Sequence, residues 1–411
     1  MLNALTDSKL LFAGLILALL QGIAALPWLW ALDSKGFRKA ITDPMSMITA
    51  LASLFGFAAL IALFIGNFGE SDSLRLYGRG FASLLHLQLL IGLFIAMPQV
   101  LLLIAPKTGA VALAAYREGW RQPMFWLIAG GAAMAMIISV FIPYYTFGDD
   151  YKMMKMIGFD IVMLAAAFFG VLAASLSISE EIEGRTAITV MSKPINRRSF
   201  LVGKYLGIMM ACVSMGLILA WVLNWALLVS STQDRLNEVR DVMNIQAQES
   251  IVPEVAGLFS HSTAAVFAEG MGAWIADTFE HSCGVALGVG QVMILVAIAT
   301  ALATRLAFVV NVLITLLVYF LGNLAPVVVK ATEKSSDGGV SMGLVRFFGQ
   351  MFDTLLPALE FFQMNTAIVR ETPINLLDFG YYVLTVLGYS LIYTTITLIV
   401  GLLLFENRDL A

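Results

Sequence analysis

Long apolar runs separated by short polar segments dominate this chain. A helix of about 20 residues covers the hydrocarbon core of a bilayer, which is about 30 Å thick. The pattern therefore predicts an all-α polytopic membrane protein with about nine transmembrane helices. The expected spans are 10–32, 45–68, 81–104, 124–143, 157–178, 204–229, 284–304, 307–328 and 381–404.

Composition supports this class and narrows the chemistry. Of 411 residues only 13% are charged, about half the share of a soluble protein, and the net charge is −4. The chain has no basic stripe, so nucleic acid is not an expected partner. Cys212 and Cys283 lie far apart, and the three histidines lie in separate segments. We therefore expect this chain to bind no metal and no cofactor of its own.

The positions of lysine and arginine predict which loops face the cytoplasm. Three alternating segments, 33–44, 105–123 and 179–204, are rich in these bases. The segment 230–283 instead has eight acids against Arg235 and Arg240, which suits the outer side. Nine spans with a cytoplasmic C-terminus place the N-terminus outside. Merging the two spans around Arg305, or losing the first span, would move the N-terminus to the cytoplasm.

Two outer segments are expected to be ordered. In 263–280 apolar residues recur at helical spacing, which predicts either a helix at the outer interface or a core helix of a small external lobe. In 341–378 the same spacing is broken by Pro357 and Pro373, so a helix that dips partway into the membrane is expected.

Features of membrane enzymes and of ion-coupled carriers are scarce. The polar residues in mid-span are mostly neutral, and His86 is the titratable one among them, which favours a histidine packed between helices over a proton relay. No phosphate-binding loop is present, because Gly203-Lys204 is followed by Tyr205. The chain is therefore not expected to be an enzyme, and ATP and Mg would have to be held by another polypeptide.

The most informative segment runs from Ser179 to Gly207. An acidic turn opens a short apolar run, Pro194 stops it, and paired arginines begin the next element. This pattern predicts two short helices or turns held at the cytoplasmic surface, although charge alone is also typical of an ordinary solvated loop.

The order of these residues resembles the signature of ATP-binding-cassette permeases of the type-two exporter class. The resemblance covers about 114–411. It implies that this segment forms the coupling elements on which an ATPase subunit docks. The residues that would take part are Glu180, Glu181, Glu183, Arg185, Thr186, Ser192, Pro194, Arg197, Arg198 and Lys204. One departure is that Arg185 separates Gly184 from Thr186, whereas many members of the class have adjacent Gly and Thr.

Two further matches fall where that class would have them. The segment 114–126 is similar to the amphipathic elbow before the first core span, and the tail 405–410 is similar to the Phe-x-x-Arg-Asp-Leu that ends many such permeases. On an elbow helix the arginines lie one turn apart and the aromatic rings fit the headgroup level. The expected interfacial residues are Tyr116, Arg117, Trp120 and Arg121.

The resemblance implies a six-span permease core, 107–411. A three-span N-terminal unit, 1–106, and an external insertion at 230–283 are additional to that core. The resemblance also implies an exporter of a hydrophobic or amphipathic substrate in the cell membrane. The expected partners are an ABC ATP-binding subunit, a second permease copy and the lipid bilayer. The alternatives are a membrane scaffold or anchor for extracytoplasmic partners, and an ion-coupled carrier that depends on His86.

Overall fold

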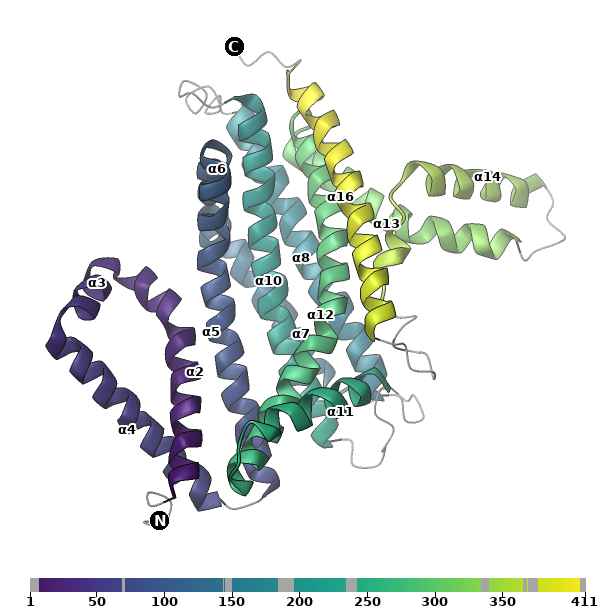
Figure 1. Ribbon diagram of the computed structural model, residues 1–411. Helices are drawn as coiled ribbons and strands as arrows, with labels where there is room; N and C mark the ends of the chain where they lie inside the picture. Colours follow the sequence, from purple (N-terminus) through teal and green to yellow (C-terminus); the bar gives the residue numbers. More distant parts are fainter. Residues whose placement is uncertain are drawn as a thin grey trace. The chain divides into compact units, whose positions relative to one another are not determined.

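A computed structural model describes residues 7–68, 71–142, 144, 150–183, 196–233, 242–333, 340–364, 368 and 376–406. Throughout these residues the regular elements are helices, without a strand (Figure 1). Their bounds are α2 Ser8–Leu32, α3 Ser34–Thr42, α4 Pro44–Phe68, α5 Asp72–Ile104, α6 Pro106–Arg121, α7 Pro123–Ser139, α8 Asp150–Glu183, α10 Arg197–Gln233, α11 Val242–Gly257, α12 Ser262–Ala303, α13 Phe308–Glu333, α14 Val340–Leu355, the 3-10 helix η1 Leu359–Phe362, and α16 Leu376–Glu406.

The number of spans agrees with the apolar pattern. Over the described parts of the chain, eight helices are long and apolar enough to cross a membrane, and the bent pair α6 and α7 brings the number to nine. The prediction of an all-α polytopic membrane protein is thereby confirmed. Several helices run past their apolar stretch; α8, for example, covers Asp150–Glu183 where 157–178 is expected.

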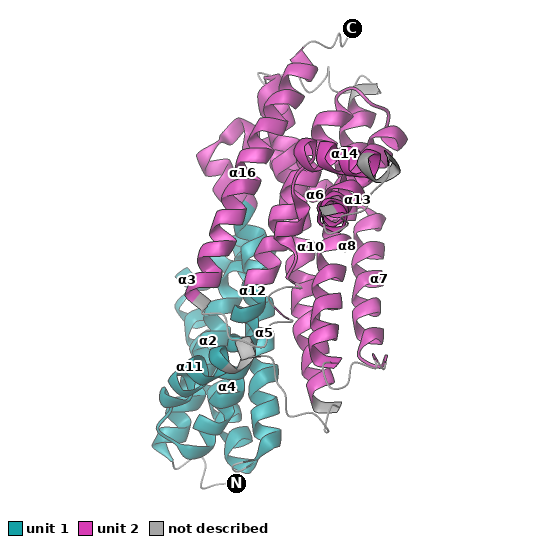
Figure 2. Cartoon of the chain, turned by 90° about the vertical axis from the view of Figure 1, so that its right-hand side faces the viewer, with its two compact units in different colours: residues 1–97, 237–282 teal, residues 98–236, 283–411 magenta. Residues whose placement is uncertain are grey.

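The chain divides into two compact units, coloured separately in Figure 2. Unit 1 comprises 1–97 and 237–282, and unit 2 comprises 98–236 and 283–411. Residues 237–282 thus group with the N-terminal segment, whereas the sequence analysis assigns 230–283 to the core as an insertion. Helices α5 and α12 each contribute residues to both units.

Within unit 1, aspartates mark the ends of the first helices. The Asp7 carboxylate caps α2 by accepting from the Lys9 amide at 2.9 Å, and Asp33 caps α3 by accepting from the Gly36 amide at 2.9 Å. Asp43 precedes α4 and accepts from both the hydroxyl and the amide of Ser46, which lowers the pKa of this carboxyl. The polar segment 33–44 is therefore a short helix between two caps.

The acidic segment joins unit 1 through a close crossing of α5 and α12. A Cβ added at Gly78 would lie 2.0 Å from the Phe267 carbonyl oxygen, and one at Gly270 would lie 1.9 Å from the Arg75 carbonyl oxygen. The two backbones are therefore in direct contact. Arg75 donates to Glu269 at 2.8 Å beside this crossing.

Continuity of α12 corrects one expectation. The structure has a single helix of 42 residues where a separate helix at 263–280 and a span at 284–304 are expected. The acids that mark 263–280 as outer are partnered inside unit 1: Asp277 accepts from Arg79 at 3.3 Å and from Gln248 at 3.0 Å. Because these partners satisfy the charge, the helix continues without a break. The buried positions of Phe267 and Trp274 favour the core-helix alternative.

In unit 2, several helix ends come together near residues 183 and 196, on either side of the 184–195 gap. Helix α8 ends there and α10 begins there. Ser179 of α8 donates to the Leu306 carbonyl in the turn between α12 and α13 at 3.2 Å, and Arg305 of that turn donates to the Leu404 carbonyl near the end of α16 at 2.9 Å. The two spans around Arg305 are therefore separate helices joined by a tight turn, as the nine-span prediction requires.

The segment before the first core span, where an amphipathic elbow is expected at 114–126, contains the helix α6. Pro106 and Pro123 stand at the first positions of α6 and α7, where a missing amide hydrogen does no harm. Pro123 also ends α6, so the two helices meet at Gln122 with a bend of 59°.

The segment before α16 contains the expected helix and its proline break. Helix α14 ends at Leu355, two residues before Pro357, and η1 follows. In Figure 1, α14 lies beside the second half of α13, where Gly349 faces Val328. Lys330 of α13 pairs with Glu360 of η1 at 2.7 Å. The depth of this hairpin in a membrane stays a prediction.

Candidate functional site

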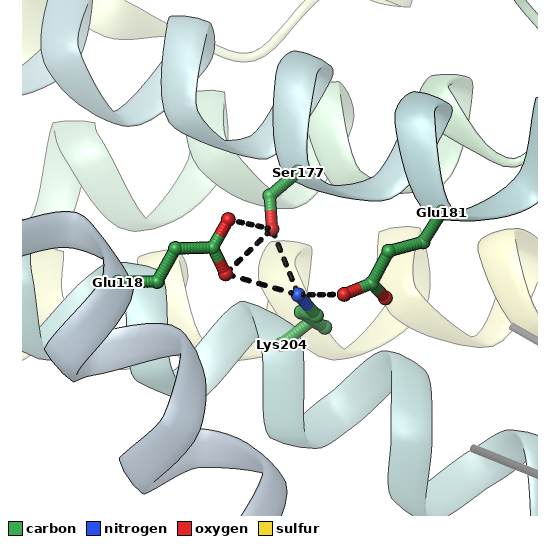
Figure 3. A network of polar contacts seen from close by, with 4 residues as sticks. All are labelled: Glu118, Ser177, Glu181 and Lys204. Carbon is green, nitrogen blue, oxygen red and sulfur yellow. Dashed lines mark hydrogen bonds and ion pairs between the residues drawn. The ribbon is translucent and has the colours of Figure 1, made fainter. Parts of the chain in front are cut away.

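A cluster of polar side chains joins three helices of unit 2 beside the 184–195 gap (Figure 3). Lys204 of α10 donates through Nζ to Glu181 of α8 at 2.6 Å and to Ser177 Oγ at 2.8 Å. It also reaches Glu118 of α6 at 3.3 Å, and Ser177 donates to the same carboxylate at 3.3 Å. We call these four residues the Lys204 cluster.

Burial makes this cluster electrostatically asymmetric. The Lys204 side chain is 5% exposed, whereas Glu118 is 44% and Glu181 27% exposed. A buried ammonium needs an anion beside it, because the interior solvates charge poorly. The two carboxylates keep contact with water and do not depend on the lysine to the same degree. The buried Lys204 ammonium therefore depends on the carboxylates that α6 and α8 supply.

The same end of unit 2 binds the end of α16. The last carbonyls of a helix have no partner within it. Arg197 donates to the carbonyl oxygens of Phe405 and Glu406 at 2.9 Å each, and Arg198 pairs with the Glu406 carboxylate at 3.2 Å. An apolar core lies beneath them, made of Val111, Ile178, Phe200, Leu201, Ala303 and Phe405. The first turn of α10 is thereby fixed to the last turn of α16.

Small residues bring α6 and α10 into backbone contact. A Cβ at Gly203 would lie 2.7 Å from the Val111 Cβ, and one at Gly207 would lie 2.4 Å from the Ala112 carbonyl oxygen. Both sequences advance in the same direction, so α6 and α10 run parallel. Movement of α10 along its axis is opposed by this contact and by the Lys204 cluster.

These contacts connect helices of unit 2 to one another. Two cavities inside unit 2, one beside Phe159 and Met209 and one beside Phe168 and Tyr319, have volumes of about 10 and 20 Å³. The described residues include no group of three His, Cys, Asp or Glu side chains that could hold a metal ion. The Lys204 cluster is thus a joint between α6, α8 and α10, in the sense that its bonds connect these three helices.

A comparison with protein families identifies the region that contains this joint. Residues 120–243 match the model of the ABC-2 family transporter protein. This segment is therefore similar to the membrane-spanning part of ABC-2-type permeases. Searches of curated proteins and of solved structures found no match. The family match starts at the end of α6 and covers α7, α8 and α10, so it includes Ser177, Glu181 and Lys204.

At one end of unit 2, contacts hold four of the residues expected at the coupling segment. Glu181 and Lys204 belong to the cluster, and Arg197 holds the end of α16. Glu180 is exposed, and Arg198 is exposed beside Glu406. Arg185, Thr186, Ser192 and Pro194 lie outside the described residues, and of Glu183 the structure describes the backbone alone.

The expected elbow residues divide into two groups. Tyr116 is buried, 3.1 Å from the Ser214 hydroxyl of α10, and Trp120 stacks on Phe125 with ring centres 4.9 Å apart. These rings pack against α10 and α7 of unit 2. Arg117 and Arg121 are exposed, and their interfacial role stays a prediction.

Two residues of the Lys204 cluster are not predicted from the sequence. Glu118 lies inside the quoted elbow segment, between two arginines that suggest a solvated face, and Ser177 lies in an apolar run. The available signal was the position of Lys204, a lysine seven residues into a long apolar helix. Such a lysine needs a carboxylate nearby. The sequence could not show which helix supplies it.

His86, the titratable mid-span residue, lies in unit 1. Its ring centre is 6.4 Å from that of Trp274. This placement agrees with a histidine packed between helices.

Proposed function

We propose that this ABC-2-type permease exports a hydrophobic or amphipathic substrate and is driven by a separate ATP-binding subunit. That subunit would hold ATP and Mg and dock on unit 2 where α8 ends and α10 begins. The observation that carries the proposal is the Lys204 cluster within and beside the family-matched segment. It ties both helices that flank the 184–195 gap to α6.

The proposed mechanism uses these contacts as a rigid joint. A docked ATPase that closes on ATP would push on the segment between α8 and α10. Because Lys204 bonds to Glu181 and Glu118, the ends of α6, α8 and α10 would tilt together. The bonds from Arg197 to the end of α16 would carry the same movement to the last helix.

A second permease copy completes the proposed pathway. The two small cavities of unit 2 hold no substrate-sized space. Helix α7 has exposed apolar side chains, including Trp126, Leu127 and Met134, which suit either lipid or another permease copy. We therefore place the substrate path between two copies in the cell membrane.

The proposed orientation follows from the docking site. The end of α16 lies beside the start of α10. Docking of a cytoplasmic ATPase at α10 therefore places the C-terminus in the cytoplasm, and nine spans place the N-terminus outside.

The test is reconstitution of the full chain with the ATPase that co-purifies with it. ATP hydrolysis by that ATPase should rise in vesicles that contain the permease, and the permease alone should hydrolyse no ATP. Glu180→Lys, a reversal at an exposed residue, should reduce this stimulation without loss of folded protein. Glu254→Lys, at an exposed residue of α11 in unit 1, is the matched control and should leave stimulation unchanged.

Reversal of Glu181 together with Arg198, two of the expected coupling residues, would be a poorer test. Glu181 bonds to Lys204, so its reversal would damage the joint as well as any docking surface. ATP hydrolysis or pumping by the purified chain without a companion would overturn the proposal. Equal stimulation by Glu180→Lys and the natural chain would overturn the assigned docking site. A chain that stimulates no ATPase and only holds outer partners would support the scaffold alternative.

A further inference from the structure

The short helix α3 of unit 1 lies between two membrane spans (Figure 1). It is joined to α2 through Asp33 alone and to α4 through Asp43 alone, and both neighbours are long and apolar enough to cross a membrane. One residue carries the chain at most about 3.6 Å. Helix α3 therefore lies at the membrane surface. Trp28 and Trp30 near the end of α2 suit this level, because tryptophan is enriched at membrane–water interfaces.

The sequence of α3 separates basic from apolar side chains around the helix. Successive residues of a helix are turned by about 100°, so Lys35, Arg38 and Lys39 lie within about 100° of one another. By the same spacing, Phe37 and Ile41 lie on the other side of α3. This division is typical of a helix that lies in the plane of a membrane interface with its apolar face toward the acyl chains.

Little of α3 packs against the rest of the chain. None of its nine residues is buried, and the Ile41 side chain is 55% exposed. A helix of this length is marginal in water, even with a good cap. A surface outside the chain therefore has to stabilise α3, and the bilayer is the surface that lies at this level.

The three bases of α3 are available to an anion. All three are exposed, and in the part of the chain that the structure describes none has a carboxylate within ion-pair distance. The two nearest aspartates act as caps instead: Asp33 accepts from backbone amides of α3, and Asp43 accepts from Ser46. The anion at the surface of a bilayer is the lipid phosphate, which both arginine and lysine bind.

We propose that α3 binds the headgroups of anionic phospholipids. Phe37 and Ile41 would lie among the acyl chains, and the three bases would lie on the phosphates. A lipid with net negative charge, such as phosphatidylglycerol, is preferred over phosphatidylcholine, because the choline ammonium offsets the phosphate charge. The proposal concerns unit 1 alone, so its failure would leave the proposed function standing.

A fluorescent label on α3 measures this preference in a bilayer. Ala40→Cys, at an exposed position of α3, takes the label in a full chain that also has Cys283→Ser; Cys212 is buried. The chain is placed in vesicles of phosphatidylcholine. Phosphatidylglycerol or phosphatidylcholine with the same nitroxide quencher on the same acyl chain is then added as the probe.

The anionic probe should quench this label more strongly at equal amounts. One base near an anionic surface is worth about a fivefold preference, so we expect an association constant at least about fivefold larger for phosphatidylglycerol. The preference should fall as salt is added, because salt screens exposed charges. A label at Leu60→Cys, an exposed position near the other end of α4, should be quenched equally by both probes.

Glutamine variants test the bases. Replacement of all three bases of α3 by glutamine should make quenching by the two probes equal. The matched control is the triple change Lys9→Gln, Lys107→Gln and Arg346→Gln, which removes the same residue types at exposed positions outside α3. This control should keep the preference. Circular dichroism should show the same helical content for both triple variants.

A swap within α3 tests the two faces. Phe37→Lys together with Lys39→Phe keeps the composition and the net charge but places a base on the apolar face. It should reduce the preference for the anionic probe, although no charge is lost.

Four results would overturn the proposal. They are equal quenching by the two probes when the bases of α3 are unchanged, a preference that survives loss of all three bases, an equal loss in the control triple variant, and an unchanged preference after the swap. The third would show that the total charge of the chain attracts the lipid, and the fourth that the arrangement of faces on α3 has no role.

Discussion

The α5–α12 crossing in unit 1 and the Lys204 cluster in unit 2 both contain ion pairs that join helices. The ion pair contributes less to the stability of the crossing than the ion pairs contribute to that of the cluster. At the crossing the backbones touch at Gly78 and Gly270, and the Arg75–Glu269 pair lies beside them at 50% and 34% exposure. In the cluster the ammonium of Lys204 is 5% exposed and lies between three helices. Shape therefore holds the first contact, and charge holds the second.

The difference teaches which residues can be changed without consequence. An exposed ion pair contributes little, since water and salt replace its partner. A buried ion whose partner is removed loses much more, because nothing else solvates it. The two regions should accordingly respond in opposite ways to loss of charge and to added volume.

The largest effect is expected when the Lys204 cluster loses both of its anions. The double change Glu118→Gln with Glu181→Gln leaves the ammonium buried without a counter-charge. We expect a loss of about 3–5 kcal/mol in the free energy of unfolding, measured by titration with a denaturing detergent. Glu360→Gln is the control, because it removes one carboxylate from the exposed Lys330 pair and should cost less than about 1 kcal/mol. A double variant as stable as this control would show that Lys204 does not depend on its anions.

Next in size is added volume at the α5–α12 crossing. In Gly270→Ala the new methyl group would lie 1.9 Å from the Arg75 carbonyl oxygen, so the backbones must separate. We expect a loss of about 3 kcal/mol, near the upper end for overpacking. Gly56→Ala in α4 has open space around its Cβ and should instead stabilise the helix by up to about 1 kcal/mol. Similar stabilities for the two variants would remove the argument that backbone contact holds unit 1.

A smaller effect is expected when the lysine itself is removed. Lys204→Met keeps the length of the side chain, and both carboxylates can then turn to water because they are partly exposed. The expected loss is about 1–2 kcal/mol. Stimulation of the partner ATPase should fall further than stability does, since the bonds from α10 to the Glu118 and Glu181 carboxylates are lost. Full stimulation by this variant in vesicles would argue against the joint.

The smallest effect is expected at the exposed pair of unit 1. Arg75→Gln removes the bonds to Asp72 and Glu269. It should change the free energy of unfolding by at most about 1 kcal/mol, and less at high salt. Stability measured at low and high ionic strength checks this. A loss larger than that of Gly270→Ala would reverse the order of shape and charge given above.

Much of the fold follows from the sequence because a bilayer leaves few choices. Apolar runs of about 20 residues must become helices there, since the hydrocarbon offers no partner for backbone groups. Pro106 and Pro123 likewise fix the starts of α6 and α7. The ends of helices that continue beyond the apolar run could not be predicted from the sequence. Polar residues of α8 and α12 extend these helices where side chains of other helices bind them.

The sequence predicted only half of the residues of the candidate site. Lys204 and Glu181 stand in a recognisable segment, so the sequence pointed to them. Glu118 and Ser177 were missed because their role depends on which helices lie side by side. The grouping of 237–282 with the N-terminal segment was missed for the same reason, as Arg75 and Arg79 are about 200 residues from the acids they bind.

The sequence by itself determined that the chain is a bundle of membrane helices, and its ordered motif near Ser179–Gly207 predicted the ABC-2 class that residues 120–243 match. Both depend on local residue type, because hydrophobicity and helix-breaking residues act over one span. The tertiary structure alone decided the partners of Lys204, the continuity of α12 and the close crossing of α5 and α12. Those features arise where separate helices meet, and the spacing of residues along one chain does not specify such meetings.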